Sequence, residues 1–141
     1  MTIESGSLIF FAIVDDRLGL KEGTQDQKIL FSITSQLDFE TLVISVGHMQ
    51  TVIGLCQHFA RNTKFFRTKL TITFVFSPQE HIHYMLRVGR TDSIDVYLPF
   101  LQHLSDVYSM LFNNDYSTEN KENMKKLFMP IFQNYTFNEL L

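Results

Sequence analysis

The sequence predicts an α+β domain in which an antiparallel sheet carries one helix on one face and two helices on the other. Three observations lead to this fold class. Short runs typical of strands come in two pairs, one long helical period separates the pairs, and two helical segments follow the second pair. Because few helices lie between the strands, we expect neighbouring strands to pair antiparallel. The predicted order is β-β-α-β-β-α-α, with one further strand as an option.

Length and composition are those of a single globular domain. The chain has 141 residues, of which 45% are hydrophobic and 19% are charged, so we expect one hydrophobic core spanning residues 1–141. The formal net charge of −3 argues against a nucleic-acid partner. One cysteine cannot form an internal disulfide, which suits a reducing compartment. No run reaches the ~18 apolar residues of a membrane span, and no signal peptide is evident, so we expect a cytosolic protein.

The first strand pair is predicted at Leu8–Val14 and Lys28–Thr34. LIFFAIV is a continuous apolar run that is too short for a helix and reads as a buried strand. The intervening Asp15–Gln27 is polar and contains two glycines, so it is expected to be a loop. Two consecutive strands joined in this way are expected to be neighbours in one sheet.

A long helix is predicted from about Thr41 to Arg61, with Asp38 as its N-cap. Its apolar residues form a stripe that should face the sheet: Leu42, Val46, Met49, Val52 or Ile53, Cys56 and Phe59. The opposite stripe contains Gly47, Gln50 or Thr51, Gly54, His58 and Arg61.

The two glycines make this opposite stripe unusual. Each costs a helix interior ~1 kcal/mol relative to alanine, but a missing side chain lets another backbone approach closely, as between packed helices. We interpret the stripe as a docking face made of Gly47, Thr51, Gly54, His58 and Arg61. The alternative is that a solvated helix tolerates the glycines.

The second strand pair is predicted at Phe65–Phe76 and His81–Val88, joined by a tight turn at Ser77–Glu80. Both strands alternate. The inward residues are Leu70, Ile72, Phe74, Phe76, Ile82, Tyr84, Leu86 and Val88, and His81, His83 and Arg87 point outward. We expect Thr68–Phe76 or its neighbour to be a free edge that pairs with a partner sheet. The residues expected at that edge are Lys69, Thr71 and Thr73.

Two helices are predicted to complete the chain. Ile94–Phe112 has a helical period, with Pro99 in its first turn, where a missing N–H does no harm. After the polar loop NNDYSTEN, an apolar stripe indicates a last helix, disturbed by Pro130. This stripe contains Met124, Leu127, Phe128, Ile131 and Phe132.

No set of side chains predicts catalysis, a metal site or a cofactor. His81 and His83 share one strand face, but no second Cys/His cluster completes a four-coordinate zinc site. Cys56 lies on the apolar stripe, where a free cysteine behaves as a small hydrophobic residue. The glycines of LGLKEG lie between two strands, so no helix N-terminus is available to bind a phosphate. The basic and aromatic run Arg61–Lys69 fits either an anionic membrane surface or a helix end followed by core phenylalanines.

Three stretches, taken in order, resemble a known family. They are the loop and strand from Gly19 to Phe31, the helical GLCQHF of Gly54–Phe59, and YSMLFNN of Tyr108–Asn114 followed by NMKKLFMPIFQNY. Together they resemble the N-terminal longin domain of the calcium–caffeine–zinc-sensitivity (CCZ) vacuolar fusion proteins, over roughly Leu8 to Leu141. The longin proteins of lysosome-related organelle biogenesis and of planar polarity are similar to this family and remain alternatives.

The resemblance implies a fold, partners and a location. It implies a longin fold and a non-catalytic module, the N-terminal part of a longer protein, which pairs with a MON-type longin subunit across the two sheets. The pair acts as a guanine-nucleotide exchange factor for a late-endosomal or vacuolar Rab GTPase, with the first helices as the platform. It implies a cytoplasmic protein, peripheral to the late-endosomal, lysosomal or vacuolar membrane. Other readings are a different longin-type trafficking adaptor, a domain that binds lipids or anionic surfaces, and a small enzyme.

Overall fold

The computed structural model describes residues 3–35, 37–59 and 65–134, and within these the side chains of residues 56–59 and 134 are left aside. The elements, in chain order, are β1 (Leu8–Asp15), the 3-10 turn η1 (Gln25–Lys28), β2 (Ile29–Thr34), α1 (Phe39–Phe59), β3 (Phe65–Arg67), β4 (Thr71–Gln79), β5 (Ile82–Gly89), α2 (Tyr97–Phe112), the 3-10 turn η2 (Thr118–Asn120) and α3 (Lys121–Asn134).

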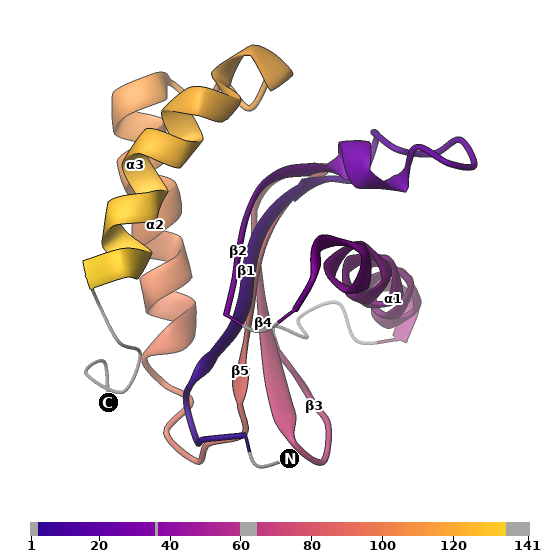
Figure 1. Ribbon diagram of the computed structural model, residues 1–141, viewed down its shortest axis with the longest axis vertical. Coiled ribbons are helices and arrows are strands. Elements are labelled where there is room, and N and C mark those ends of the chain that lie inside the picture. Colours follow the sequence, from indigo (N-terminus) through magenta and orange to yellow (C-terminus); the bar gives the residue numbers. More distant parts are fainter. Residues whose placement is uncertain (1–2, 36, 60–64, 135–141) are drawn as a thin grey trace.

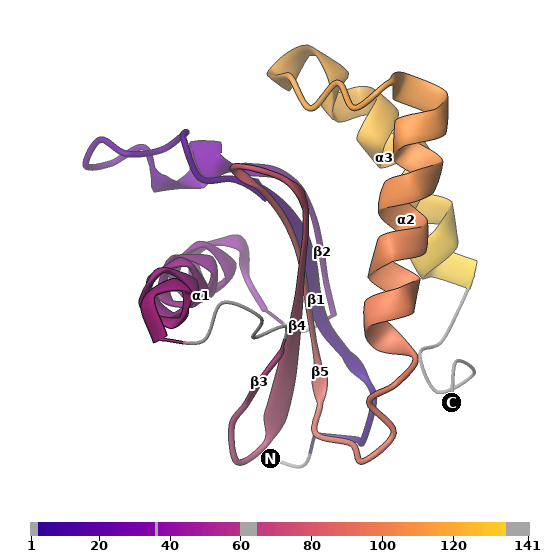
Figure 2. The ribbon, with the colours of Figure 1, turned by 180° about the vertical axis from the view of Figure 1, so that it is seen from behind.

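The strands form one five-stranded sheet in the order β2-β1-β5-β4-β3, and every neighbouring pair is antiparallel. Helix α1 lies on one face of the sheet, and α2 and α3 lie on the other (Figures 1 and 2). The predicted α+β class and the distribution of helices are therefore confirmed. The fifth strand arises because the predicted strand Phe65–Phe76 is divided into β3 and β4, and not from an added strand after β5.

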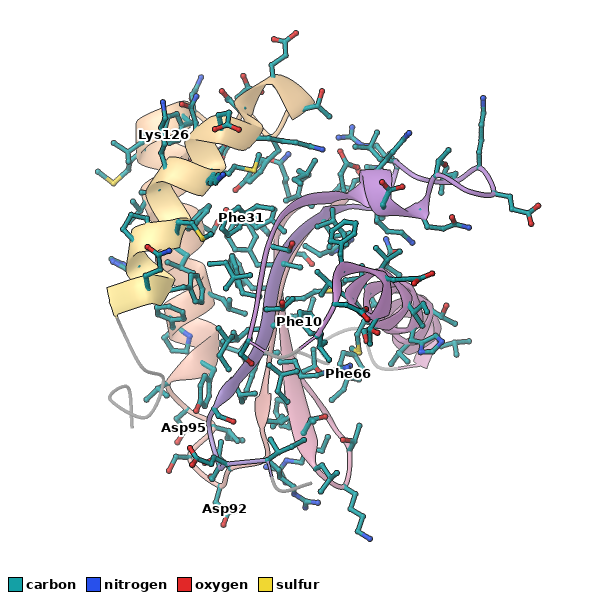
Figure 3. All side chains as sticks on the ribbon, viewed as in Figure 1. Phe10, Phe31, Phe66, Asp92, Asp95 and Lys126 are labelled. Carbon is teal, nitrogen blue, oxygen red and sulfur yellow. The ribbon has the colours of Figure 1, made fainter. Side chains whose placement is uncertain are left out.

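Two apolar clusters lie on either side of the sheet. The larger fills the space between the sheet and the pair α2 and α3, and the smaller lies between the sheet and α1. In Figure 3, Phe31 points toward α3, whereas Phe10 and Phe66 lie on the side of α1. The sheet is therefore covered on both faces, so the strand positions expected to face water are largely buried. His83 is an example, with 7% of its surface exposed.

The long strand expected at Phe65–Phe76 is wrong, because the chain turns back within it. Thr68 N–H donates to the Thr71 carbonyl at 2.8 Å, and Thr71 N–H donates to the Thr68 hydroxyl at 3.1 Å. Lys69 and Leu70 form the turn between β3 and β4. Leu70, expected in the core, is 52% exposed.

The next turn also differs from its expected position. Strand β4 continues through the predicted turn to Gln79, with a register shift after Phe76 that accommodates Pro78. The chain reverses at Glu80 and His81, where His81 adopts a positive φ of 73°.

Candidate protein-binding surface

Helix α1 presents one face to the sheet and one to solvent. Asp38 is its N-cap, as predicted, because its carboxylate accepts from Thr41 N–H at 2.7 Å. On the inner face, Leu42, Val46 and Met49 are buried against β1, β2, β4 and β5, and Ile53 packs beside them. The predicted inner stripe is thus confirmed as far as Ile53. Cys56 and Phe59 carry side chains that lie outside the described residues.

The outer face of α1 is more apolar than the glycine stripe suggested. Phe39, Ile44 and Leu55 are 52%, 55% and 58% exposed. Ile44 and Leu55 are three turns apart and share a side of the helix with Thr51, which is also exposed. Sequence reasoning missed these apolar side chains, although their spacing from Thr51 and Gly54 would have placed them on this face. We call Ile44, Thr51, Gly54 and Leu55 the outer face. Phe39, the first residue of the helix, lies about 140° around the helix from Ile44 and lines a groove next to η1.

The two glycines of α1 have different surroundings. Apart from the adjoining turns of its own helix, a methyl group at Gly54 would meet no heavy atom of the described residues within 4 Å. At Gly47 it would lie 3.9 Å from Nζ of Lys28. Gly54 thus faces open space as predicted, whereas Gly47 lies against another segment of its own chain. The docking-face residues His58 and Arg61 lie outside the described side chains.

Lys28 joins η1 to α1. Its side chain is largely buried, with 9% of the residue exposed, and Nζ donates to Gln50 Oε1 at 2.9 Å. Beside this contact, a groove of about 580 Å³ separates η1 from the first half of α1. Its walls include Asp26 and Lys28 of η1 and Phe39, Val43, Ile44 and Gly47 of α1. The groove therefore extends the outer face toward η1.

The sheet ends at β2 on one side and at β3 on the other, so β4 is not an edge strand. Residues Ile72–Phe74 of β4 pair with β5 on one side and with β3 on the other. The expectation that Thr71 and Thr73 lie on a free edge is therefore wrong. Thr73 is 1% exposed, and its hydroxyl accepts from Arg87 Nε at 2.7 Å. Lys69 lies in the β3–β4 turn, and the neighbouring strand β3 ends the sheet.

The two strand histidines form a cluster with Asp16. His81 Nδ1 lies 2.6 Å from one Asp16 carboxylate oxygen, and His83 Nε2 lies 2.8 Å from the other. The second ring nitrogen of His83 is 2.6 Å from the Ser77 hydroxyl. This arrangement fastens the end of β1 to the β4–β5 turn. Within the described part of the chain, no group of His, Cys, Asp and Glu side chains is arranged to hold a metal ion.

Asp15, next in the chain to this cluster, forms a two-point ion pair with Arg17. Arg17 Nε and Nη2 donate to its two carboxylate oxygens at 3.0 and 2.8 Å, and Arg17 N–H adds a third bond. The side-chain hydrogen bonds from Arg17 hold the pKa of Asp15 below its ordinary value, against the effect of burial.

This pair is expected to stabilise the fold above about pH 4 and to lose its effect in acid. The folded pKa of Asp15 lies below the unfolded value of about 3.9, so the stabilisation is complete above the unfolded value and disappears as the pH falls through the folded one. In Arg17→Met the difference in unfolding free energy from wild type should therefore shrink in acid. Urea unfolding over a pH series measures this, with Lys21→Met as the control. Parallel curves for wild type and Arg17→Met down to about pH 2 would contradict the assignment.

Comparison with known proteins identifies the fold family. None of the helices in the described part of the chain has the length and hydropathy to cross a bilayer. No curated protein matches the chain. A family model described as the first longin domain of INTU, CCZ1 and HPS4 matches residues 8–113. This match covers the sheet, α1 and α2, which carry the outer face and the β3 edge described above. The chain therefore belongs to the family of the first longin domains of INTU, CCZ1 and HPS4.

Proposed function

We propose that this chain is the longin interaction module of a heterodimeric guanine-nucleotide exchange factor for a Rab GTPase of late endosomes, lysosomes or vacuoles. Longin domains of this family form heterodimers with other longin-domain proteins. In this proposal the partner is a MON-type longin subunit, and the pair works at the cytoplasmic side of those membranes. The observation that carries the proposal is the outer face of α1, where large apolar side chains remain exposed on a helix whose other face is already buried.

The mechanism needs no catalytic side chain. An exchange factor binds the nucleotide-free GTPase more tightly than the nucleotide-bound form, and this difference in affinity promotes release of the nucleotide. An exposed apolar face on a fixed helix suits that role. Contact with this face can stabilise one conformation of a switch segment of the GTPase. The groove between η1 and α1 offers a concave site for an apolar side chain of that segment.

The edge strand β3 supplies the second contact in this proposal. An unpaired strand edge presents backbone N–H and C=O groups that can extend a sheet into a neighbouring molecule. Strand β3 ends the sheet. We infer that the longin partner adds its own strand at β3, which would leave the outer face of α1 to the GTPase.

Gly54→Leu is the variant that tests the outer face. The structure leaves room for the new side chain, since no described atom outside the adjoining turns of the helix lies within 4 Å of a Cβ at Gly54. Helix propensity should rise by up to ~1 kcal/mol, so the melting temperature should stay the same or increase. Binding of the GTPase, and with it nucleotide release, should fall at least tenfold, a loss of about 1.4 kcal/mol.

A matched control places the same leucine on another exposed helix position, Gln102→Leu in α2. This control should leave both binding and release unchanged. Unfolding of Gly54→Leu would mean that the glycine packs inside the domain. Unchanged stability together with unchanged binding would mean that this part of α1 contacts no partner. A longin adaptor without exchange activity would bind its partner and fail to accelerate release even in the wild-type form.

A further inference from the structure

The turn between β3 and β4 gathers basic side chains around an exposed leucine. Arg67, Lys69 and Arg90 are all exposed, and among the described residues none of them forms an ion pair. Leu70 lies between them with 52% of its surface exposed. Arg90 belongs to this group because its backbone N–H donates to the Leu70 carbonyl at 2.9 Å. We call these four residues the basic turn.

Internal hydrogen bonds hold this turn in a fixed shape. In addition to the two bonds that close it, the hydroxyls of Thr68 and Thr71 lie 2.7 Å apart. The turn projects from one end of the sheet, away from the α2–α3 connection at the opposite end (Figures 1 and 2). A preformed, projecting turn loses little conformational entropy when it binds a surface.

Among the described residues, the acidic side chains at this end of the molecule form no ion pair with the basic turn. Asp92 and Asp95 lie at the same end, but toward α2 (Figure 3). Neither they nor Glu4, in the described structure, comes within ion-pair distance of the three cations. The chain as a whole carries a formal net charge of −3. Attraction of the protein to an anionic surface therefore depends on the orientation of the protein. The basic turn determines which end approaches such a surface.

We propose that the basic turn docks on an anionic membrane surface, with Leu70 inserted among the lipid headgroups and the three cations against anionic lipids. A convex turn with a leucine at its tip suits a soft, flat surface, whereas docking of a folded protein requires a larger complementary area. Each cation near such a surface contributes about fivefold in affinity. This site is separate from the outer face of α1. Arg67 also belongs to the β3 edge, so Leu70, Lys69 and Arg90 are the residues that test membrane docking apart from partner binding.

A single tryptophan can report insertion, because the chain contains none. Leu70→Trp should shift its fluorescence to shorter wavelengths when vesicles of phosphatidylcholine and phosphatidylserine are added, and not with phosphatidylcholine alone. Met110→Trp is the control. Met110 is 85% exposed in the last turn of α2, and that end of α2 lies at the opposite end of the molecule (Figure 1). No shift for Leu70→Trp, or an equal shift for Met110→Trp, would overturn the proposal.

Vesicle co-sedimentation tests the cations separately. Lys69→Ala combined with Arg90→Ala should weaken binding to the phosphatidylserine vesicles roughly 25-fold, at about fivefold for each cation. Lys125→Ala combined with Lys126→Ala removes the same charge from α3 and should have little effect; Figure 3 shows Lys126 far from the turn. Thermal unfolding confirms that each variant is folded. Wild-type vesicle binding by the first double variant, or equal losses in the two, would overturn the proposal.

Discussion

Replacing Phe128 by alanine is expected to lower the free energy of unfolding by about 3–5 kcal/mol. The Phe128 side chain is fully buried and lies where α3 meets the sheet and α2. Its ring centroid is 5.9 Å from Phe11, 5.7 Å from Phe31 and 6.0 Å from Tyr108. Removing the ring leaves a cavity among side chains from β1, β2 and α2, which cannot all move inward to fill it.

Urea unfolding followed by circular dichroism gives the measurement. Folded domains have only about 5–15 kcal/mol of stability, so Phe128→Leu provides a milder variant if the alanine form does not fold. Leu111→Ala is the control, because Leu111 is 60% exposed on α2 and should change stability by about 0.5 kcal/mol or less. A loss below about 1 kcal/mol for Phe128→Ala would show that α3 packs loosely on the sheet.

Arg67→Pro should weaken binding of the longin partner roughly hundredfold, whereas Arg67→Ala should have a much smaller effect. Thr68 and Thr71 form a hydrogen-bonded pair, as Thr68 N–H donates to the Thr71 carbonyl. Pairs alternate along an antiparallel ladder, so Arg67 and Ile72 form a non-bonded pair, and Arg67 N–H points away from β4. Proline removes this outward donor and leaves the β3–β4 ladder intact.

The comparison between the two Arg67 variants isolates the backbone group. Both variants lose the guanidinium group and its cation–π contact with Phe65, in which Cζ lies 5.5 Å from the ring centroid. Only the proline variant also loses the backbone N–H. A buried acceptor left without its donor costs about 1–3 kcal/mol, which corresponds to the expected loss of affinity. Titration calorimetry with the MON-type subunit measures both affinities. Equal affinities for the proline and alanine variants would show that β3 is not the contact.

The sequence predicts local features of this fold better than long-range ones. The inner stripe of α1 and its cap at Asp38 follow from helical spacing and from an oxygen that can reach Thr41 N–H. The turn at Lys69 and Leu70 could not be predicted in the same way. It contains no glycine, proline or asparagine, and threonine hydrogen bonds close it within a run that otherwise reads as one strand.

The sheet edge was mislocated because of the same turn. After the turn, β3 pairs with the outer side of β4, which brings together Phe66 and Thr73. A pattern within single strands does not specify such a partner. The same limit applies to Asp16 and the strand histidines, since the chain separates the members of that cluster widely.

The sequence predicted where the outer face of α1 lies, but not that this face is apolar. The glycines indicated a face turned away from the core, and Gly54 confirms it. The apolar side chains of Ile44 and Leu55 were not assigned to that face, because the helix is apolar on most sides and its period is correspondingly weak.

The bond between Lys28 and Gln50 has a consequence for how α1 can respond to a partner. Any sliding or tilting of the helix would pull Gln50 away from the largely buried Lys28 amine, and an unmet buried donor costs about 1–3 kcal/mol. We therefore expect α1 to keep its position when a partner binds. Under the proposed exchange function, the conformational change would then occur in the GTPase and not in this helix.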